Sequence, residues 1–434
     1  MGKLQLHWRI LIAIVAGVAA GWLAGEQGAL FGVTFYSVFD FVGTLFINAL
    51  KMLIVPLIVS SIIVGVAGIG GGGNLGRLGG KTLLFYGVTT LMAILIGLVL
   101  VNLVQPGIVD GEPARDLLAL EESTRAVAES VGATAGSGGG GQLARLFMSM
   151  VPPNIIQAAA EGQMLGLIFF SIVFGYFMTR VENEQSEAMY RFWDGLFAVM
   201  MKVTEWVMTF APIGVFGLVA RTVAQTGFDA ARPLVVFSLT VLGALALHAL
   251  ISIPLLVKTV GKVSPVALYR AAAPALLTAF STASSSATLP ITMDAMEKRA
   301  GVSNRTSSFV LPLGATVNMN GTALYECVAA MFIAQAYGLE LSFGVQFVIV
   351  ITALVTSVGV AGIPSASLVA IAIILAAVGL PVEAIGVLFV FDRILDMART
   401  AINILGDCAC AVIVAKLEGE EGVLVEGGPQ RARS

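Results

Sequence analysis

Charged residues are scarce in this chain of 434 residues: Lys, Arg, Asp and Glu together make up 12%, whereas 57% of the residues are hydrophobic. A mean hydropathy of +0.93 excludes a soluble globular protein, because such a protein must cover its surface with polar groups. The net charge of −3 also argues against a nucleic-acid partner. The composition is typical of an all-α protein that spans a membrane several times.

Cysteine and histidine are scarce as well, with three and two copies. Three cysteines offer no disulfide framework, and we interpret Cys408 and Cys410, with no histidine near them in sequence, as packing residues rather than metal ligands. The adjacent serines at 284–286 could suggest an intramembrane serine protease with His248 as its base. A nucleophilic serine needs a histidine within hydrogen-bonding reach, however, and His248 lies in the apolar stretch 244–252, where a satisfied core histidine is expected. We expect no enzymatic activity.

Long apolar runs dominate what is present. A helix needs about 20 residues, at 1.5 Å each, to cross the hydrocarbon layer of a bilayer. Eight runs meet this requirement, near residues 9–24, 37–68, 83–104, 147–178, 194–222, 232–257, 308–337 and 385–415. The first could be a signal peptide, but similar runs follow it without a soluble domain, so we predict a first span. Two more apolar stretches, 264–290 and 345–378, are interrupted by Ser, Gly and Pro, which predicts re-entrant hairpins.

Lysine and arginine in short loops favour the cytoplasmic side of a membrane. Eight spans with both termini in the cytoplasm place the main basic loop residues there, namely Arg77, Lys81, Lys258, Lys262, Arg270, Lys298, Arg299 and Arg305. The acidic loop 106–146, with "GSGGGG" at 136–141, then lies outside and is expected to be flexible. The predicted location is the plasma membrane, or the inner membrane if the source is a Gram-negative bacterium.

A polar stripe interrupts the last apolar run. The segment 392–407, "DRILDMARTAINILGD", contains five charges in sixteen residues. Each Asp or Arg at the centre of a membrane helix costs roughly 2.5–3.5 kcal/mol on insertion scales. At about 100° per residue, six polar residues fall on one face: Asp392, Asp396, Arg399, Thr400, Asn403 and Asp407. A structural ion-pair network could explain such a stripe, but it is more typical of a wet cavity that holds ions and substrate.

The two broken segments are also rich in polar or flexible residues at their centres. Seven of the eleven residues in 278–288 are Ser or Thr, and 356–367 contains Gly359, Gly362 and Pro364. Lipid cannot satisfy the backbone groups that such breaks expose, so the breaks must line a cavity or be buried in protein. Paired broken hairpins are typical of transporters, in which helix ends face carboxylates and unwound carbonyls face cations.

Four motifs in order closely resemble the dicarboxylate/amino acid:cation symporter family: "SSSATLP" at 284–290, "GATVNMNGTALYE" at 314–326, "GVAGIPSAS" at 359–367 and "DMARTAINILGD" at 396–407. The resemblance implies a homotrimer in which a scaffold surrounds transport domains that slide like elevators across the membrane. The scaffold would contain residues 1–80 and 147–225. The transport domain would contain 81–105 and 226–434, ending in a cytoplasmic tail, with the hairpin at 345–378 as its gate.

The resemblance also assigns a site for an acidic amino acid, glutamate or aspartate. Arg399 would bind its side-chain carboxylate and Asp396 its ammonium group, which agrees with the planar fork of a guanidinium. The α-carboxylate and the walls of the pocket would be contacted by Ser285, Ser286, Thr322, Ile363, Thr400 and Asn403. The alternatives are a C4-dicarboxylate, which has no ammonium group for Asp396, and a neutral amino acid, which does not need Arg399.

Sodium is the expected coupled ion, with a proton as a further candidate, and no other cofactor is implied. The resemblance predicts one sodium site at Gly314, Asn318, Asn403 and Asp407, where span seven would unwind at Asn318. A second would be formed by Thr316, the region of Met319 and the backbone around Ser357, and a third is associated with Tyr86, Thr89, Thr90 and position 320. Glu326 is predicted to carry the proton, because burial disfavours the charged form of a carboxylate.

The sequence departs from the pattern of this family in two places. Relatives usually have an accessory arginine at the position of Ala283 or of Met397, and this chain has neither; Arg393 could take its place. The motif usually has aspartate where Asn320 stands, which removes a negative ligand from the third sodium site.

Overall fold

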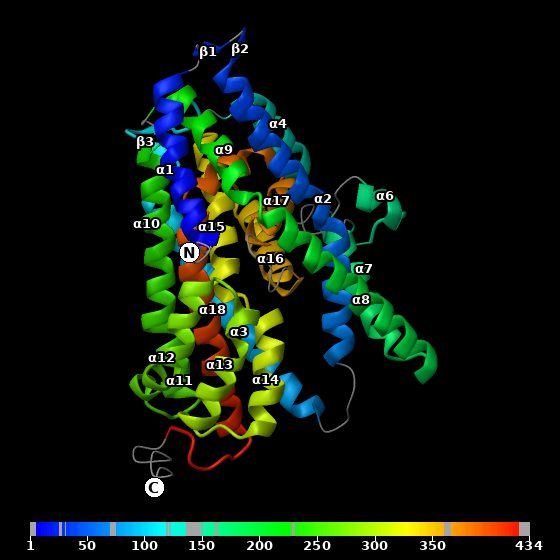
Figure 1. Ribbon diagram of the computed structural model, residues 1–434. Coiled ribbons are helices and arrows are strands. Elements are labelled where there is room, and N and C mark those ends of the chain that lie inside the picture. The colour runs from blue at the N-terminus through cyan, green and yellow to red at the C-terminus, as the bar shows by residue number, and fades with distance from the viewer. Residues whose placement is uncertain are drawn as a thin grey trace, which may run out of the picture.

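Helices form nearly all of the described structure (Figure 1). The computed structural model describes residues 6–25, 28–30, 32–69, 75–118, 120, 123–135, 148, 151–160, 164–227, 231–359 and 366–424. Within these residues, two short antiparallel pairs of strands accompany the helices: β1 (Ala29–Leu30) with β2 (Val33–Thr34), and β3 (Ile108–Val109) with β4 (Glu112–Pro113). The prediction of an all-α protein is therefore confirmed.

The helices before residue 230 are α1 (Leu6–Ala24), α2 (Phe35–Ile69), α3 (Leu75–Val104), α4 (Thr124–Ala135), α6 (Ile155–Ala160), α7 (Met164–Met178), α8 (Asn183–Met208) and α9 (Ala211–Thr226). Those after it are α10 (Ala231–Leu247), the π-helix η1 (His248–Ser252), α11 (Ile253–Thr259), α12 (Pro265–Thr282), α13 (Ser285–Lys298), α14 (Asn304–Val317), α15 (Asn320–Ala336), α16 (Phe343–Gly359), α17 (Ala366–Val378), the 3-10 helix η2 (Val382–Leu388) and α18 (Phe389–Leu417).

Three helical stretches among the described residues are long and apolar enough to cross a membrane: Leu78–Val104, Ala231–Thr259 and Phe391–Leu417. Of the other predicted spans, 9–24 and 37–68 each lie within a single helix, α1 and α2, whereas some are divided into shorter helices. The apolar run 194–222 is shared by α8 and α9, which meet at Thr209 and Phe210 because Pro212, which has no N–H, suits the first turn of a new helix. The last run begins as the 3-10 helix η2 and becomes α-helical only at Phe389.

Both predicted hairpins are pairs of packed helices. In the first hairpin, α12 ends at Thr282, Ala283 adopts a left-handed conformation with φ of 49°, and the Ser284 side chain accepts a hydrogen bond from the Ala287 N–H to start α13. Its second arm continues to Lys298, beyond the predicted end at residue 290. In the second hairpin α16 packs against α17, and its tip, which includes Ile363, lies outside the described residues.

The helices pack in two groups. α1, α2, α7, α8 and α9 contact one another, while α3 and the helices from α10 to α18 form the other group. Figure 1 shows α2, α7 and α8 along one side and α10 to α12 along the other. α1 and α9 approach closely because Gly21 has no Cβ, which would overlap with the carbonyl oxygen of Ala220. Close packing through small residues is typical of helices in membranes.

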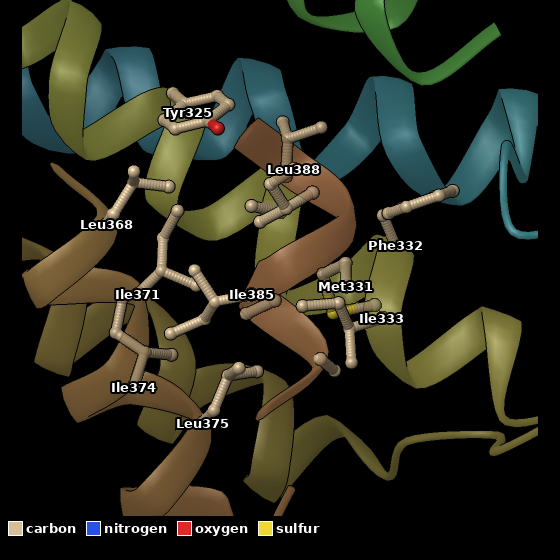
Figure 2. Packing of buried hydrophobic residues seen from close by; sticks show 14 of the residues in the cluster. Tyr325, Met331, Phe332, Ile333, Leu368, Ile371, Ile374, Leu375, Ile385 and Leu388 are labelled. Carbon is tan, nitrogen blue, oxygen red and sulfur yellow. The ribbon is translucent and has the colours of Figure 1, made fainter. Parts of the chain in front are cut away.

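The larger apolar core surrounds α15 and also includes buried residues of α2, α8 and α9 from the first group. Figure 2 shows Tyr325 of α15 near Leu368 of α17, and Ile371 of α17 facing Ile385 of η2. Another cluster of buried apolar residues joins α12, α13 and α14 to α18. Since α18 also contacts α15, the polar stripe of α18 lies within the centre of the second group.

The segment after α18 folds back onto the start of α14. Glu420 accepts hydrogen bonds from the Ser303 N–H at 2.8 Å, the Ser303 hydroxyl at 2.6 Å and the Thr306 hydroxyl at 2.5 Å. Burial disfavours the charged carboxylate, but these hydrogen bonds outweigh that effect and lower the pKa of Glu420 from its usual value. Lys81 of α3 pairs with Glu418 at 2.5 Å. The segment thus joins the ends of α3, α14 and α18.

Replacing Glu420 by glutamine should lower the free energy of unfolding by about 1 kcal/mol at pH 7, since solvent screens this partly exposed group. A carboxylate with a lowered folded-state pKa stabilises above its unfolded pKa, near 4.5, and loses that effect as the pH falls through the folded value. In detergent, the difference in thermal midpoint between parent and Glu420→Gln should therefore shrink as the pH falls below about 4.5 and vanish once the pH is below the lowered folded-state pKa. Glu421→Gln, at an exposed neighbour, is the control, and an equal loss there would contradict the prediction.

Candidate functional site

The helix predicted for residues 308–337 is broken where the sequence suggested. α14 ends at Val317, Asn318 and Met319 have non-helical backbone angles, and α15 begins at Asn320. The Asn318 N–H still donates to the Gly314 carbonyl at 2.9 Å. The break leaves backbone groups without helical partners inside the protein, next to the stripe of α18.

Asn318 connects this break to α18. Its side-chain Nδ2 donates to the Asn403 carbonyl at 3.0 Å and to Asp407 Oδ1 at 2.8 Å, while its own Oδ1 is buried without a partner. A Cβ on Gly314 would overlap with Asp407 Oδ1, so the backbone of α14 lies against this carboxylate. The first predicted sodium set, Gly314, Asn318, Asn403 and Asp407, is thus brought together, with Asp407 1% exposed.

The surroundings of Asn320, in the predicted third sodium site, differ from those of Asp407 in the first. Its Oδ1 accepts the Gly321 N–H at 2.9 Å, and its Nδ2 is buried without a hydrogen-bond partner. Among the other residues of the predicted third site, Tyr86 donates to the Val310 carbonyl at 2.9 Å, and its hydroxyl lies beside Gly314. Thr89 and Thr90 are buried on α3, with Thr89 bonded to backbone carbonyls of its own helix.

The second predicted sodium set is less closely connected. Thr316 is exposed and donates to the Leu313 carbonyl at 3.0 Å, and buried Ser357 donates to the Leu354 carbonyl at 2.9 Å. Met319 is joined to the site, because its Sδ accepts from Asn403 Nδ2 at 3.1 Å. Thr316, Met319 and Ser357 share no hydrogen bond with one another in the described structure.

Arg399 lies fully buried at the centre of the α18 stripe. Its Nη2 is 2.9 Å from Asp392 Oδ1 and 3.1 Å from Asp396 Oδ1, and its guanidinium carbon is 3.8 Å from the centre of the Tyr325 ring. Its Nε and Nη1 are buried without partners, so the guanidinium retains donors for another carboxylate. Arg393 Nη1 lies 3.6 Å from Asp396 Oδ2. The sequence placed Asp392 on the stripe but did not identify it as the partner of Arg399.

The other predicted substrate contacts have mixed surroundings. Asn403 also accepts the Gly321 N–H through Oδ1 at 2.8 Å and donates to the Thr322 hydroxyl at 3.1 Å. Ser285 and Thr400 are buried, whereas Ser286 is exposed at the start of α13. Both arms of the first hairpin pack against α18, although no hydrogen bond joins Ser285 or Ser286 to it.

Glu326 is fully buried on α15. Its Oε2 lies 3.1 Å from the Thr356 hydroxyl, and its Oε1 has no hydrogen-bond partner. His248 is buried in the π-helix η1, but neither of its ring nitrogens has a hydrogen-bond partner, so the prediction of a satisfied core histidine is wrong. A π-helix arises from one extra residue in a turn, which the apolar pattern does not reveal. Cys408 and Cys410 are buried and free.

The described site thus combines a buried guanidinium with free donors, the four carboxyl groups of Asp392, Asp396, Asp407 and Glu326, and a broken helix rich in amide groups. A family model described as the Sodium:dicarboxylate symporter family matches residues 6–417. The chain belongs to this family. The match includes every site residue discussed above, and it makes the protein an integral membrane transporter of the symporter type.

Three relatives illustrate the similarity. The chain is 36% identical over 419 residues to the proton/glutamate-aspartate symporter of Escherichia coli (strain K12), with 96% of this chain and 93% of the relative covered. It is 34% identical over 425 residues to the proton/sodium-glutamate symport protein of Bacillus caldotenax, with 97% and 96% covered. It is 35% identical over 458 residues to mouse excitatory amino acid transporter 3, with 96% and 87% covered.

Proposed function

We propose that this protein is a secondary active symporter that takes up glutamate or aspartate, driven by sodium and proton gradients. The observation that carries the proposal is Arg399, fully buried with two nitrogens that have no partner. A buried guanidinium with free donors suits the side-chain carboxylate of an acidic amino acid. Asp396, three residues earlier on the same helix, would bind the ammonium group. The names of the relatives, which are glutamate or glutamate-aspartate symporters, support this substrate class.

The coupled ion in this proposal is sodium, bound beside Asp407. A hard cation needs oxygen ligands, and the Asp407 carboxylate, the Asn318 amide oxygen and the carbonyls of the helix break supply them. The unpartnered Oδ1 of Asn318 supports such a site, because a buried acceptor without a partner is costly unless a cation or water occupies the space beside it. A proton on Glu326 would add to the driving force.

The architecture we propose is a homotrimer with eight spans and both termini in the cytoplasm. Residues 1–80 and 147–225 would form the scaffold, and residues 81–105 and 226–434 an elevator-type transport domain gated by the hairpin at 345–378. The closer packing of α1, α2 and α7 to α9 with one another than with the other helices supports this division. The protein would lie in the plasma membrane, or in the inner membrane of a Gram-negative bacterium.

Arg393 is the residue we assign to support Asp396 in place of an accessory arginine. With Arg399 near one carboxylate oxygen and Arg393 3.6 Å from the other, both oxygens of Asp396 face a guanidinium. A C4-dicarboxylate is disfavoured as the substrate because it has no ammonium group for Asp396. A neutral amino acid is disfavoured because it would leave the donors of Arg399 unpaired.

The test is radiolabelled uptake into proteoliposomes, with sodium and pH gradients imposed separately. We expect aspartate and glutamate to accumulate under an inward sodium gradient and to respond to an imposed pH gradient. Succinate and serine should not compete at concentrations that saturate with aspartate. Accumulation of succinate, or uptake of aspartate that ignores the sodium gradient, would refute the proposal.

Asn320 leads us to expect one fewer coupled sodium than in relatives with aspartate at this position. A sodium ion held by neutral oxygens alone leaves an uncompensated charge in a low dielectric. Asn320 adds no charge, and its only side-chain oxygen accepts a hydrogen bond from the Gly321 N–H. Each charge moved across 100 mV contributes about 2.3 kcal/mol, so a missing sodium lowers the attainable concentration ratio strongly.

The measurement for Asn320 is the reversal potential of substrate flux in proteoliposomes as the sodium gradient is varied. A sodium stoichiometry that rises by one in Asn320→Asp supports the prediction. The same stoichiometry in the parent and in Asn320→Asp, at the value of relatives with aspartate, would contradict it.

A further inference from the structure

One hydroxyl of the second hairpin faces the buried carboxylate of α15. Thr356, on α16, places its Oγ1 3.1 Å from Glu326 Oε2, and both side chains are fully buried. The same hydroxyl lies 2.8 Å from the Thr352 carbonyl, one turn earlier on α16, and 3.3 Å from the Ala353 carbonyl. α15 and α16 pack against each other at this point.

A threonine hydroxyl has only one proton to donate. At 2.8 Å the Thr352 carbonyl is the closer acceptor, and a threonine in a helix commonly bonds to the carbonyl one turn back. The lone pairs of Oγ1 are then left to face Glu326. An ionised Glu326 would repel them, whereas a protonated Glu326 would donate its O–H to them.

The rest of the environment agrees with a neutral carboxylic acid. Glu326 Oε1 has no hydrogen-bond partner, and an ionised carboxylate with an unpaired buried oxygen would be costly. Thr356 and the Arg399 guanidinium of α18 are the neighbours that act on Glu326 from other helices in the described structure. The charge of Arg399 is already offset, because Asp392 and Asp396 both pair with it.

We propose that Thr356 is a positioning residue that accepts a hydrogen bond from protonated Glu326 and thereby couples the proton on α15 to the position of α16. This inference rests on the proposed function, in which Glu326 carries a transported proton. When the proton leaves, Thr356 either faces a carboxylate with its lone pairs or gives up its bond to the Thr352 carbonyl. The first outcome weakens the contact between α15 and α16, and the second removes a hydrogen bond within α16 itself.

The coupling works in both directions. If protonation of Glu326 favours the packed position of α16, then packing of α16 must favour protonation by the same factor. α16, the first arm of the second hairpin, also contains Ser357, the next residue. If substrate binding requires α16 to be packed against α15, it would therefore also favour protonation of Glu326. The hydrogen bond to Thr356 would link the two events.

The experiment measures aspartate affinity of the purified protein between pH 5 and 9 at saturating sodium. Thr356→Val keeps the shape of the side chain but removes the hydroxyl. It should weaken proton binding roughly fivefold, the usual net effect of one hydrogen bond, and so move the midpoint of the pH dependence down by about 0.7 pH unit. Thr356→Ser should restore the parent midpoint, and Thr356→Ala serves as a second hydroxyl-free variant.

The double variant Glu326→Gln, Thr356→Val separates this inference from the proposed function. It should show no more pH dependence than Glu326→Gln alone, which we expect to be nearly pH-insensitive. A midpoint that moves upward or stays in place in the hydroxyl-free variants would overturn the role of Thr356, while leaving proton coupling intact. Unchanged pH dependence in Glu326→Gln would instead overturn the proton assignment of Glu326 in the proposed function.

Discussion

Arg399→Ala should abolish the uptake of aspartate and glutamate. The substitution removes the donors for the substrate carboxylate and leaves Asp392 and Asp396 buried without their common partner. A buried charge that loses its partner costs about 3–5 kcal/mol, so the carboxylate of the bound substrate, left without Arg399, should lose affinity by roughly 100-fold or more. Radiolabelled uptake and equilibrium binding of aspartate measure this loss, and we also expect Arg399→Cys to admit small neutral amino acids such as serine.

Two further variants separate lost recognition from lost folding. Arg191→Ala removes an exposed arginine that pairs with Glu187 on α8, and it should leave uptake unchanged. The double variant Arg399→Ala, Asp392→Asn removes one of the orphaned charges, so it should regain thermal stability without regaining transport. If Arg399→Ala bound aspartate as tightly as the parent does, the assignment of Arg399 would be wrong.

The arrangement around Arg399 shows which features of the site could be predicted from the sequence. The helical period placed Asp392, Asp396 and Arg399 on one face, and the expense of charges in a membrane indicated that they needed partners. The break at Asn318 and both hairpins were also predictable, because polar and small residues interrupt apolar runs there. All of these are local signals that depend on the spacing of residues along the chain.

The partners themselves depend on contacts between distant segments, which spacing alone does not fix. The bond between Asn318 and Asp407 joins the break after α14 to α18, and the contact of Glu326 with Thr356 joins α15 to α16. The sequence also missed helix ends. The first hairpin was predicted to end at residue 290, but α13 continues past Pro290 to Lys298. η2 and the π-helix at His248 require backbone geometries that apolar periodicity cannot distinguish from an α-helix.

Asp407→Asn should weaken sodium binding by about 100-fold, because Asp407 supplies the negative charge that offsets the desolvation of the ion. The side chain keeps its size, so the contact with Gly314 should persist. Substrate affinity must fall by the factor through which sodium and substrate are coupled, since linkage is reciprocal. Aspartate binding at a series of sodium concentrations measures both effects. Asp294→Asn, at an exposed position of α13 paired with Lys298, is the matched control.

The thermal midpoint provides a second test of whether Asp407 binds sodium. A residue with only a structural role would not change how the midpoint responds to sodium. Without sodium, the parent holds a buried carboxylate whose described partner is the Asn318 amide, so Asp407→Asn should be at least as stable as the parent. Added sodium should raise the thermal midpoint of the parent, because an ion that binds only the folded state stabilises it by mass action, and it should raise that of Asp407→Asn much less. An equal increase in both proteins would place the sodium ion away from Asp407. A variant less stable than the parent even without sodium would mean that the hydrogen bond to Asn318, and not the negative charge, is what this residue contributes.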